Sequence, residues 1–220
     1  GKNQWAVAGL RPRSLRTIAP ASPGFVGFDM GMRRNVPFAF MQRWLTLVSG
    51  KAGNRRLFED TSYWNGVYTE LSRGELPWRK LDELSGNASA IWQRWVDHPL
   101  PDAFWDAPSP TDRQFAKIDI PVLSITSMYD DAQFGSLEFR RRHQEMASAA
   151  AFQRHYTVIG PWTHAGTRVP GTLVGGLDFG PDSVVDVKQL HLEWYDWTLK
   201  GGKRPAFLQD RFVYFVTGDN

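Results

Sequence analysis

The order of hydrophobic and polar positions predicts a strand, a helix and a second strand in the C-terminal half of the chain. Residues 118–126 read Ile-Asp-Ile-Pro-Val-Leu-Ser-Ile-Thr, a run rich in β-branched residues that is typical of a buried strand. Residues 137–150 suit a helix, and residues 154–160 form another apolar run. Because two parallel strands need a crossover connection, this order predicts a parallel βαβ unit and an α/β fold.

The N-terminal end shows the same kinds of element. Residues 3–10 suit a helix. Residues 15–19 form a short apolar run, which we expect to be a buried strand closed by Pro20 and Pro23.

The C-terminal end predicts one more helix and one more strand. Apolar residues recur at spacings of three or four from Val184 to Trp197, and Gly201 follows them as a helix terminator. Residues 211–217 alternate between apolar and polar side chains, so they predict a strand that needs a partner sheet.

Residues 26–116 have a different character. Tryptophans recur there among polar segments that favour helices, and glycines interrupt these segments. The tryptophans are Trp44, Trp64, Trp78, Trp92, Trp95 and Trp105. Because few strand patterns are visible, we expect a helical insertion between two parts of an α/β domain.

The composition excludes several classes of protein. With 42% hydrophobic and 22% charged residues, the 220-residue chain is a globular domain rather than a disordered one. A net charge of only +3 argues against nucleic acid as a partner, and no apolar run is long enough to span a membrane. The absence of cysteine excludes disulfides and thiolate zinc sites, but it leaves the cellular location open. The histidines and glycines match no metal or phosphate motif, so we expect no cofactor.

Reactive side chains follow both strands of the predicted βαβ unit. Asp130 and Asp131 come after the first strand, and His164 comes after the second. The carboxyl ends of parallel strands meet at one edge of the sheet, which is where ligands bind. An acid followed by a histidine is also the order of the last two members of the Ser-Asp-His triad in α/β-hydrolases. Asp131 is an alternative to Asp130, and a turn aspartate with a structural histidine is the non-catalytic interpretation.

Several motifs resemble those of the CocE/NonD family, which includes cocaine-esterase-like enzymes, X-Pro dipeptidyl peptidases, glutaryl acylases and α-amino-acid ester hydrolases. The motifs are Asp97-His-Pro-Leu-Pro-Asp-Ala-Phe-Trp105, Ser127-Met-Tyr-Asp-Asp-Ala-Gln-Phe-Gly135, Ile159-Gly-Pro-Trp-Thr-His164, Asp178-Phe-Gly-Pro181 and His191-Leu-Glu-Trp-Tyr-Asp-Trp-Thr-Leu-Lys-Gly201. They occur in the order that the family shows, and the resemblance covers nearly the whole chain.

The resemblance implies the C-terminal half of an α/β-hydrolase catalytic domain, with an inserted helical cap and the start of a C-terminal β jelly roll. The implied divisions are hydrolase core at 1–25, cap at 26–116, core at 117–204 and the beginning of the jelly roll at 205–220.

The resemblance also implies roles for three residues. Asp130 matches the catalytic acid of the triad and His164 matches its base. Trp162 belongs to the Gly-Pro-Trp-x-His motif, where it either lines a pocket for the acyl group or, as we favour, supports the histidine loop.

The nucleophile motif Gly-x-Ser-x-Gly does not occur in the chain. The first residues, Gly1-Lys-Asn-Gln-Trp5, resemble the sequence that follows this motif in the family, with Gly1 as its last glycine. We therefore expect the 220 residues to be part of a longer protein whose serine lies three residues before Gly1. By themselves they should be inactive and of low stability.

The function expected from these features is that of a serine hydrolase that cleaves ester or amide acyl bonds through an acyl-enzyme. An X-Pro dipeptidyl-peptidase and a catalytically silent interaction module are the alternatives. The partner is then a small ester, amide or peptide substrate. Ala132 and Gln133 stand where the α-amino-acid ester hydrolases of the family have carboxylates, so a substrate with a free α-ammonium group is not expected.

Overall fold

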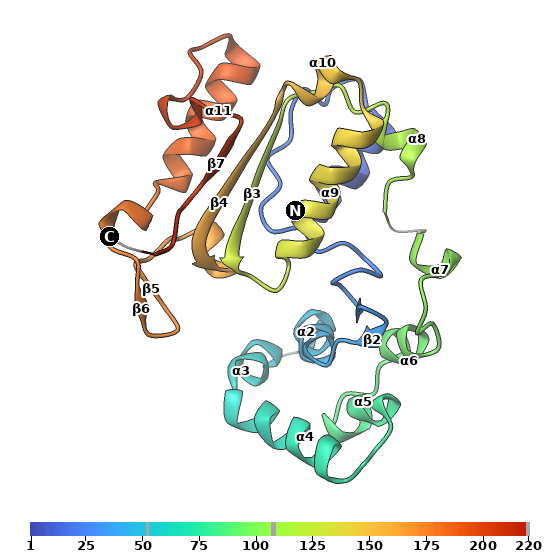
Figure 1. Ribbon diagram of the computed structural model, residues 1–220. Helices are drawn as coiled ribbons and strands as arrows, with labels where there is room; N and C mark the ends of the chain where they lie inside the picture. Colours follow the sequence, from blue (N-terminus) through green and yellow to red (C-terminus); the bar gives the residue numbers. More distant parts are fainter. Residues whose placement is uncertain (52, 107–108, 219–220) are drawn as a thin grey trace. The chain divides into compact units, whose positions relative to one another are not determined.

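The structure is a computed structural model that describes residues 1–51, 53–106 and 109–218 (Figure 1). The chain forms two compact units. One consists of Gly1–Phe25 and Asp106–Asn220, and the other of Val26–Trp105. We call them the sheet unit and the helical unit.

A parallel sheet of three strands is the centre of the sheet unit. The strands β3 (Val122–Tyr129), β4 (His155–Thr163) and β7 (Phe212–Tyr214) lie in the order β3-β4-β7, and both pairings are parallel. The helices α9 (Gln133–Met146) and α10 (Ala149–Phe152) connect β3 to β4. The predicted parallel βαβ unit is therefore present, within a fold that combines helices with a parallel sheet.

The connecting helix differs from the sequence prediction in its bounds. α9 begins at Gln133, four residues earlier than expected, and ends at Met146. Ser148 then accepts a hydrogen bond from the Ala151 amide and caps the separate helix α10. A serine that competes for backbone donors in this way ends one helix and begins the next.

The expected strand at residues 15–19 is reduced to isolated bridges beside β3. Ile18 pairs with Val122 and Ala21 pairs with Ile125, both in the parallel sense. Between them Pro20 accepts a hydrogen bond from the Ile125 amide but has no N–H to donate, so the ladder is interrupted there. The segment nevertheless runs along the free edge of β3.

Strand β7 pairs with β4 and so extends the parallel sheet. The alternating segment at 211–217 thus has its partner within the sheet unit. No jelly-roll sheet is present among the residues that the structure describes.

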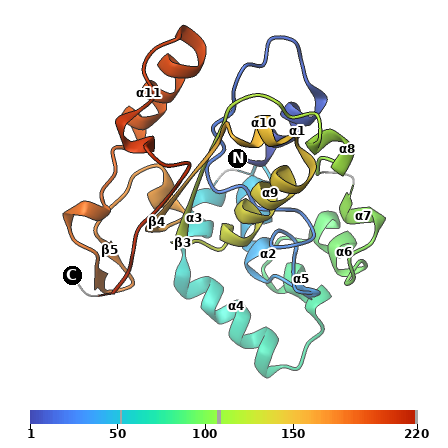
Figure 2. The ribbon, with the colours of Figure 1, turned by 45° about the horizontal axis from the view of Figure 1, so that its top comes forward.

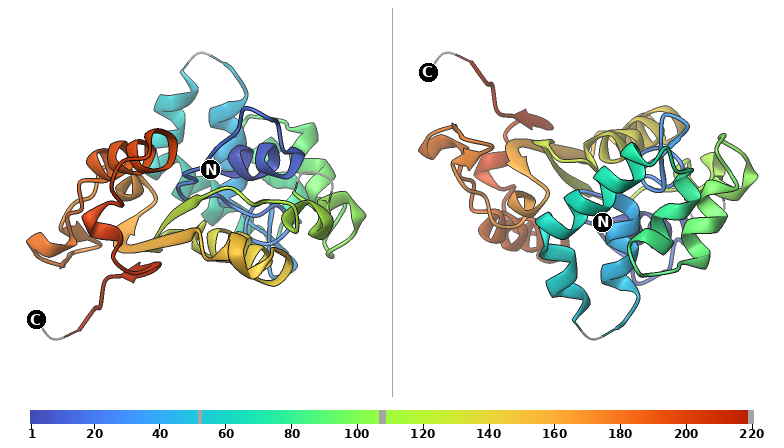
Figure 3. Two further views of the ribbon diagram at one scale, coloured as in Figure 1. Left: turned by 90° about the horizontal axis from the view of Figure 1, so that it is seen from above. Right: turned by 90° about the horizontal axis from the view of Figure 1, so that it is seen from below.

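Helices cover both faces of the sheet. α1 (Lys2–Leu10), α8 (Asp112–Phe115) and α9 supply one cluster of buried side chains, in which the rings of Trp5 and Phe139 stack at 5.2 Å. α11 (Val187–Lys200) packs against Leu123 and Tyr156 on the other face. Figure 2 and Figure 3 show α9 and α11 on opposite sides of the sheet. Coverage of both faces explains why β3 is apolar over most of its length.

After Lys200, the last residue of α11, Gly201 caps the helix in a left-handed conformation. The remaining segments of the sheet unit are short. They are η2 (Ala165–Thr167), β5 (Leu173–Val174), β6 (Leu177–Asp178), η3 (Pro181–Ser183) and η4 (Ala206–Leu208). β5 and β6 form a small antiparallel hairpin between η2 and η3.

The helical unit has its own core of tryptophan and aliphatic side chains. Its elements are β1 (Met32–Arg33), β2 (Val36–Pro37), α2 (Phe40–Val48), α3 (Asn54–Glu59), α4 (Thr61–Arg73), η1 (Trp78–Lys80), α5 (Leu81–Leu84), α6 (Ala90–Val96) and the first residues of α7 (Ala103–Asp106). Trp64 and Trp92 are fully buried in this core. Their indole N–H groups donate to the carbonyls of Leu57 and Trp78, which satisfies the only polar atom of each ring. Among the described residues, no helix combines the length and apolar character that crossing a membrane requires.

Two buried histidines connect α9 to the sheet. His143 on α9 directs Nε2 to the carbonyl of Ile118 at 3.0 Å, so Nε2 carries the proton. Its Nδ1 lies 2.9 Å from Nδ1 of His155, and Nε2 of His155 lies 2.8 Å from the Ser124 hydroxyl. The contact between the two Nδ1 atoms is a hydrogen bond only if one of them accepts, so the two rings are not both protonated. Burial is the main reason why the pKa values of both histidines are lowered.

We expect this histidine pair to make stability depend on pH. Because both folded-state pKa values lie below 6.5, the unfolded chain binds more protons as the pH falls below that value. The contribution of the two neutral histidines to the free energy of unfolding is thus complete above pH 6.5. It is lost as the pH falls toward their folded-state pKa values. Denaturant midpoints measured from pH 8 to pH 5 should show this decrease. Replacing His143 and His155 with glutamine should flatten the profile, whereas His191→Gln should not, and an unchanged slope in the double variant would contradict the assignment.

Candidate active site

The ends of β3 and β4 bring Asp130 and His164 together. The pairing of Tyr129 with Thr163 in the parallel register places the residues that follow each strand side by side. Nδ1 of His164 lies 3.0 Å from Oδ1 of Asp130, which is hydrogen-bond distance. Because a carboxylate only accepts, Nδ1 of His164 carries the proton that forms this bond. The proximity agrees with the expectation from the sequence.

Three donors satisfy the Asp130 carboxylate, whose side chain is fully buried. Oδ1 accepts from His164 and from the Ala132 amide at 2.9 Å, and Oδ2 accepts from the Ser22 hydroxyl. Burial alone would raise the pKa of Asp130, but these hydrogen bonds outweigh it and hold the pKa below its ordinary value. The carboxylate is therefore ionised and fixed in orientation.

Ser22 is a site residue that the sequence did not reveal. It lies in the segment beside β3, where its amide donates to the Ile125 carbonyl at 2.8 Å. Its backbone has a φ of 43°, which a serine adopts only where surrounding contacts impose it. No motif marks this serine, because its role depends on the bridge between residues 18–21 and a strand about one hundred residues later.

His164 is the exposed member of the pair, with 48% of its side chain accessible. The hydrogen bond from Nδ1 to Asp130 is the main reason why its pKa is raised, and the charge of Asp131 adds to the effect. Nε2 has no partner among the described residues. The ring thus keeps one nitrogen free to exchange a proton with a bound molecule.

Asp131 is half-buried beside this pair but is not the carboxylate that orients the histidine. Burial raises its pKa, and the adjacent negative charge of Asp130 raises it further. The two neighbouring aspartates therefore differ in protonation behaviour. Asp130, Asp131 and His164 each place one possible metal-ligand atom within 4.8 Å of the others. Since the Asp130 carboxylate and His164 Nδ1 already bond to each other, the arrangement serves orientation better than metal binding.

Trp162 lies in the core of the sheet unit, with 1% of its surface exposed. Its indole N–H donates to the Ser183 carbonyl at 2.7 Å. A Cβ atom at Gly160 would come within 2.4 Å of its ring atoms, and one at Gly166 within 2.4 Å of its Cβ, so both glycines make room for this side chain. Trp162 thus packs in the core against residues on both sides of His164, and its ring has almost no exposed surface.

The start of α1 packs against the loop that carries Ser22. A Cβ atom at Gly1 would lie 2.6 Å from the Ala21 carbonyl oxygen and 2.8 Å from the Pro23 nitrogen, so only glycine fits. The Gln4 side chain holds the two segments together through two hydrogen bonds to the backbone of Ala19. The N-terminal end of α1 is thus fixed next to a residue that contacts Asp130.

The hydrogen bond between Asp130 and His164 predicts a measurable shift of the histidine pKa. Asp130→Asn removes both the charge and the carboxylate acceptor, so the pKa of His164 should fall back toward the ordinary value for histidine. NMR titration of the imidazole resonances in the whole protein measures this directly. The matched variant Asp131→Asn should lower it by less, because Asp131 acts through its charge alone. A larger shift in Asp131→Asn would identify Asp131 as the orienting acid.

Comparison with known proteins places most of the chain in a protein family. The family described as X-Pro dipeptidyl-peptidase (S15 family) matches residues 1–166. No protein with a curated description matches the chain.

Solved structures show a similar fold. One is an aminopeptidase from the marine sediment archaeon Thaumarchaeota archaeon, with a TM-score of 0.56, 19% identity and coverage of 93% of this chain. Another is a CocE/NonD family hydrolase from Staphylococcus aureus, with a TM-score of 0.53, 16% identity and coverage of 96%. The chain spans 34% and 29% of the lengths of these two proteins. With its family match extending over three quarters of its length, the chain belongs to the X-Pro dipeptidyl-peptidase (S15) family.

Proposed function

We propose that the protein is a serine hydrolase that cleaves ester or amide acyl bonds through an acyl-enzyme. Asp130 is its triad acid and His164 its base. The observation that carries this proposal is the bond between a buried, ionised Asp130 and Nδ1 of His164, which leaves Nε2 available. Family membership and the likeness to hydrolase structures support it.

The proposed reaction uses both nitrogens of His164. Nε2 removes the proton of a serine hydroxyl while the serine oxygen attacks the acyl carbon, and Asp130 stabilises the imidazolium that forms. The imidazolium then gives this proton to the leaving alcohol or amine. A water molecule, deprotonated by the same nitrogen, hydrolyses the acyl-enzyme and restores the serine.

The nucleophile of this proposal comes from the residues before Gly1. The close packing of Gly1 against residues 21–23 supports this, because it holds the start of α1 beside Ser22, whose hydroxyl donates to Asp130. A residue just before Gly1 would therefore lie near the triad acid. A strained turn that leads from a strand into a helix is the usual setting of such a serine. The helical unit then corresponds to the inserted cap that the family resemblance implies.

The acid and base predict a large loss of activity when either is removed. In the whole protein His164→Ala and Asp130→Asn should each lower kcat about 10³–10⁴-fold on an activated acyl ester, because either change removes the oriented base. The pH profile of kcat/KM should rise through a midpoint above 6.5, since Asp130 raises the pKa of His164 and the neutral ring is the base.

A matched control and a substrate screen make this test decisive. Asp131→Asn changes the same charge one residue away and should lower kcat far less than Asp130→Asn. Acyl esters, amides and Xaa-Pro peptides should be compared, since both ester and peptide cleavage fit the same triad. If the whole protein carries no serine three residues before Gly1 and hydrolyses none of these, it is the silent interaction module instead.

The residues after the triad acid predict the charge preference of the substrate. Ala132 and Gln133 supply a methyl group and a neutral amide, and an ammonium group in a partly desolvated pocket requires an opposite charge. We expect neutral or anionic acyl groups with apolar bulk to be preferred. Asp131 is the nearest carboxylate, but the pKa of its side chain is raised.

A pair of esters measures this preference. A phenylglycine ester and its deaminated analogue differ only in the ammonium group, so kcat/KM for the amino form should not exceed that of the analogue. Gln133→Glu introduces a carboxylate and should shift the ratio toward the amino form. A strong preference of the unmodified protein for the amino ester would refute the expectation.

A further inference from the structure

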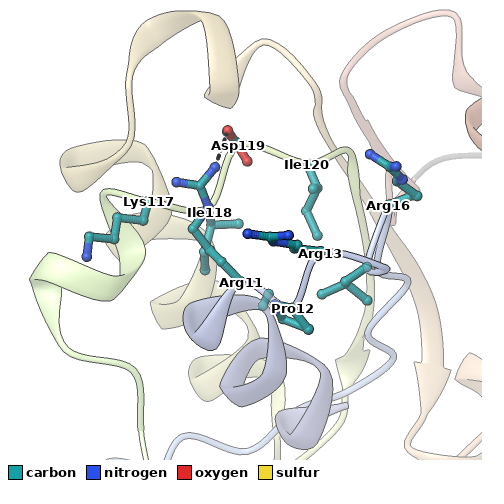
Figure 4. A pocket seen from close by; sticks show the side chains of 10 residues that line it. Arg11, Pro12, Arg13, Arg16, Lys117, Ile118, Asp119 and Ile120 are labelled. Carbon is teal, nitrogen blue, oxygen red and sulfur yellow. Dashed lines mark hydrogen bonds and ion pairs between the residues drawn. The ribbon is translucent and has the colours of Figure 1, made fainter.

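A hollow lies near the start of β3, at the opposite end of this strand from Asp130 and His164. It has a volume of about 480 Å³ and is formed by the turn after α1 and by the segment before β3 (Figure 4). The two segments lie side by side, because each leads into one member of a parallel pair in which Ile18 lies opposite Val122 at the start of β3. β3 has eight residues, which at about 3.3 Å each separate this hollow from the candidate active site by about 26 Å. It is therefore a distinct place on the molecule, which we call the basic pocket.

The basic pocket gathers positive charge. Its lining residues are Ala8, Arg11, Pro12, Arg13, Leu15, Arg16, Lys117, Ile118, Asp119 and Ile120. Four of these ten side chains are cationic and one is anionic, whereas cations and anions are nearly balanced over the whole chain. The guanidinium group of Arg154 adds to this charge, because it donates to the carbonyl of Asp119.

Among the residues that the structure describes, Arg11 is the one arginine of the pocket with an ion-pair partner. Arg11 caps the end of α1 with a left-handed backbone, and its guanidinium group bonds to Asp119 at 2.9 Å. Arg13 and Arg16 are exposed and make no hydrogen bond or ion pair with the residues that the structure describes. Figure 4 shows Arg13 between Arg11 and Arg16, while Lys117 points away at the rim. Two unpaired guanidinium groups thus remain available to a ligand.

The chemistry of the lining indicates the class of that ligand. A guanidinium group binds carboxylate and phosphate alike with two parallel hydrogen bonds, but two guanidinium groups in one hollow match the charge and the three terminal oxygens of a phosphate dianion better than a single carboxylate. Leu15 and Ile120, which are half-buried, form apolar walls beside these groups, so the anion can carry an apolar part. The volume of the pocket lies within the range of small-molecule sites. We propose that the basic pocket binds a small phosphate monoester, with Arg13 and Arg16 on the phosphate.

Phenyl phosphate is a suitable probe, because it joins a phosphate dianion to an apolar ring. Calorimetric titration of the whole protein at low ionic strength should show saturable binding to one site. Arg13→Gln with Arg16→Gln should weaken it at least about tenfold, since hydrogen bonds between charged groups are lost. The matched control, Arg56→Gln with Arg73→Gln, removes the same charge from exposed positions of the helical unit and should leave the affinity within about twofold.

A second variant tests the pocket in the opposite direction. Asp119→Asn removes the carboxylate that competes for Arg11, so phenyl phosphate should bind more tightly. Asp182→Asn, at an exposed carboxylate that does not line the pocket, should not produce this gain.

The source of the phosphate is distinguished by three further ligands. Phenol should not bind, inorganic phosphate should bind more weakly than phenyl phosphate, and vesicles that contain phosphatidic acid should not retain the protein through Arg13 and Arg16. The proposal is overturned if phenyl phosphate does not saturate the protein or if the control pair weakens binding as much as the pocket pair. It is also overturned if only the vesicles bind, because the basic residues then face a membrane surface.

Discussion

The parallel pairing of β3 with β4 is the constraint on which the candidate active site depends. Its register sets Tyr129 opposite Thr163, and the residues after these two strand ends have no freedom to separate. The strands are buried on both faces, so a slip of register would exchange the side chains that face α9 with those that face α11. The distance between Asp130 and His164 is thus fixed by the core rather than by the site itself.

Burial of Asp130 has a further consequence for the site. A buried carboxylate is stable only when its oxygens are hydrogen-bonded, and three different segments supply the donors. Ser22 comes from the segment beside β3, the Ala132 amide from the turn before α9, and His164 from the end of β4. The same bonds that stabilise the charge therefore hold three parts of the sheet unit in one arrangement. Such an arrangement needs little reorganisation when the histidine changes its protonation state.

The sequence predicted those features that depend on local patterns. Apolar runs located β3 and β4, and the position of Asp130 and His164 directly after them indicated that they meet. It did not indicate Ser22, because the contact of that residue depends on long-range pairing. It also overestimated the strand at residues 15–19, where the missing N–H of Pro20 interrupts the ladder despite a suitable apolar pattern. The spacing of apolar residues indicates which side chains are buried. It does not indicate which backbone and side-chain donors and acceptors find a hydrogen-bond partner.

The charged residues at the two ends of the parallel strands differ in how they are paired. At the carboxyl ends of the strands, the Asp130 carboxylate already accepts hydrogen bonds from His164, the Ala132 amide and Ser22 before any substrate arrives. At the amino ends, Arg13 and Arg16 have no such partner among the described residues, and the single carboxylate, Asp119, is already bound to Arg11. Unpaired like charges in one hollow repel one another, so a bound anion would lower the free energy of this end. The length of β3 keeps these two environments apart, so the proposed chemistry and the proposed phosphate binding would use opposite ends of the same strands.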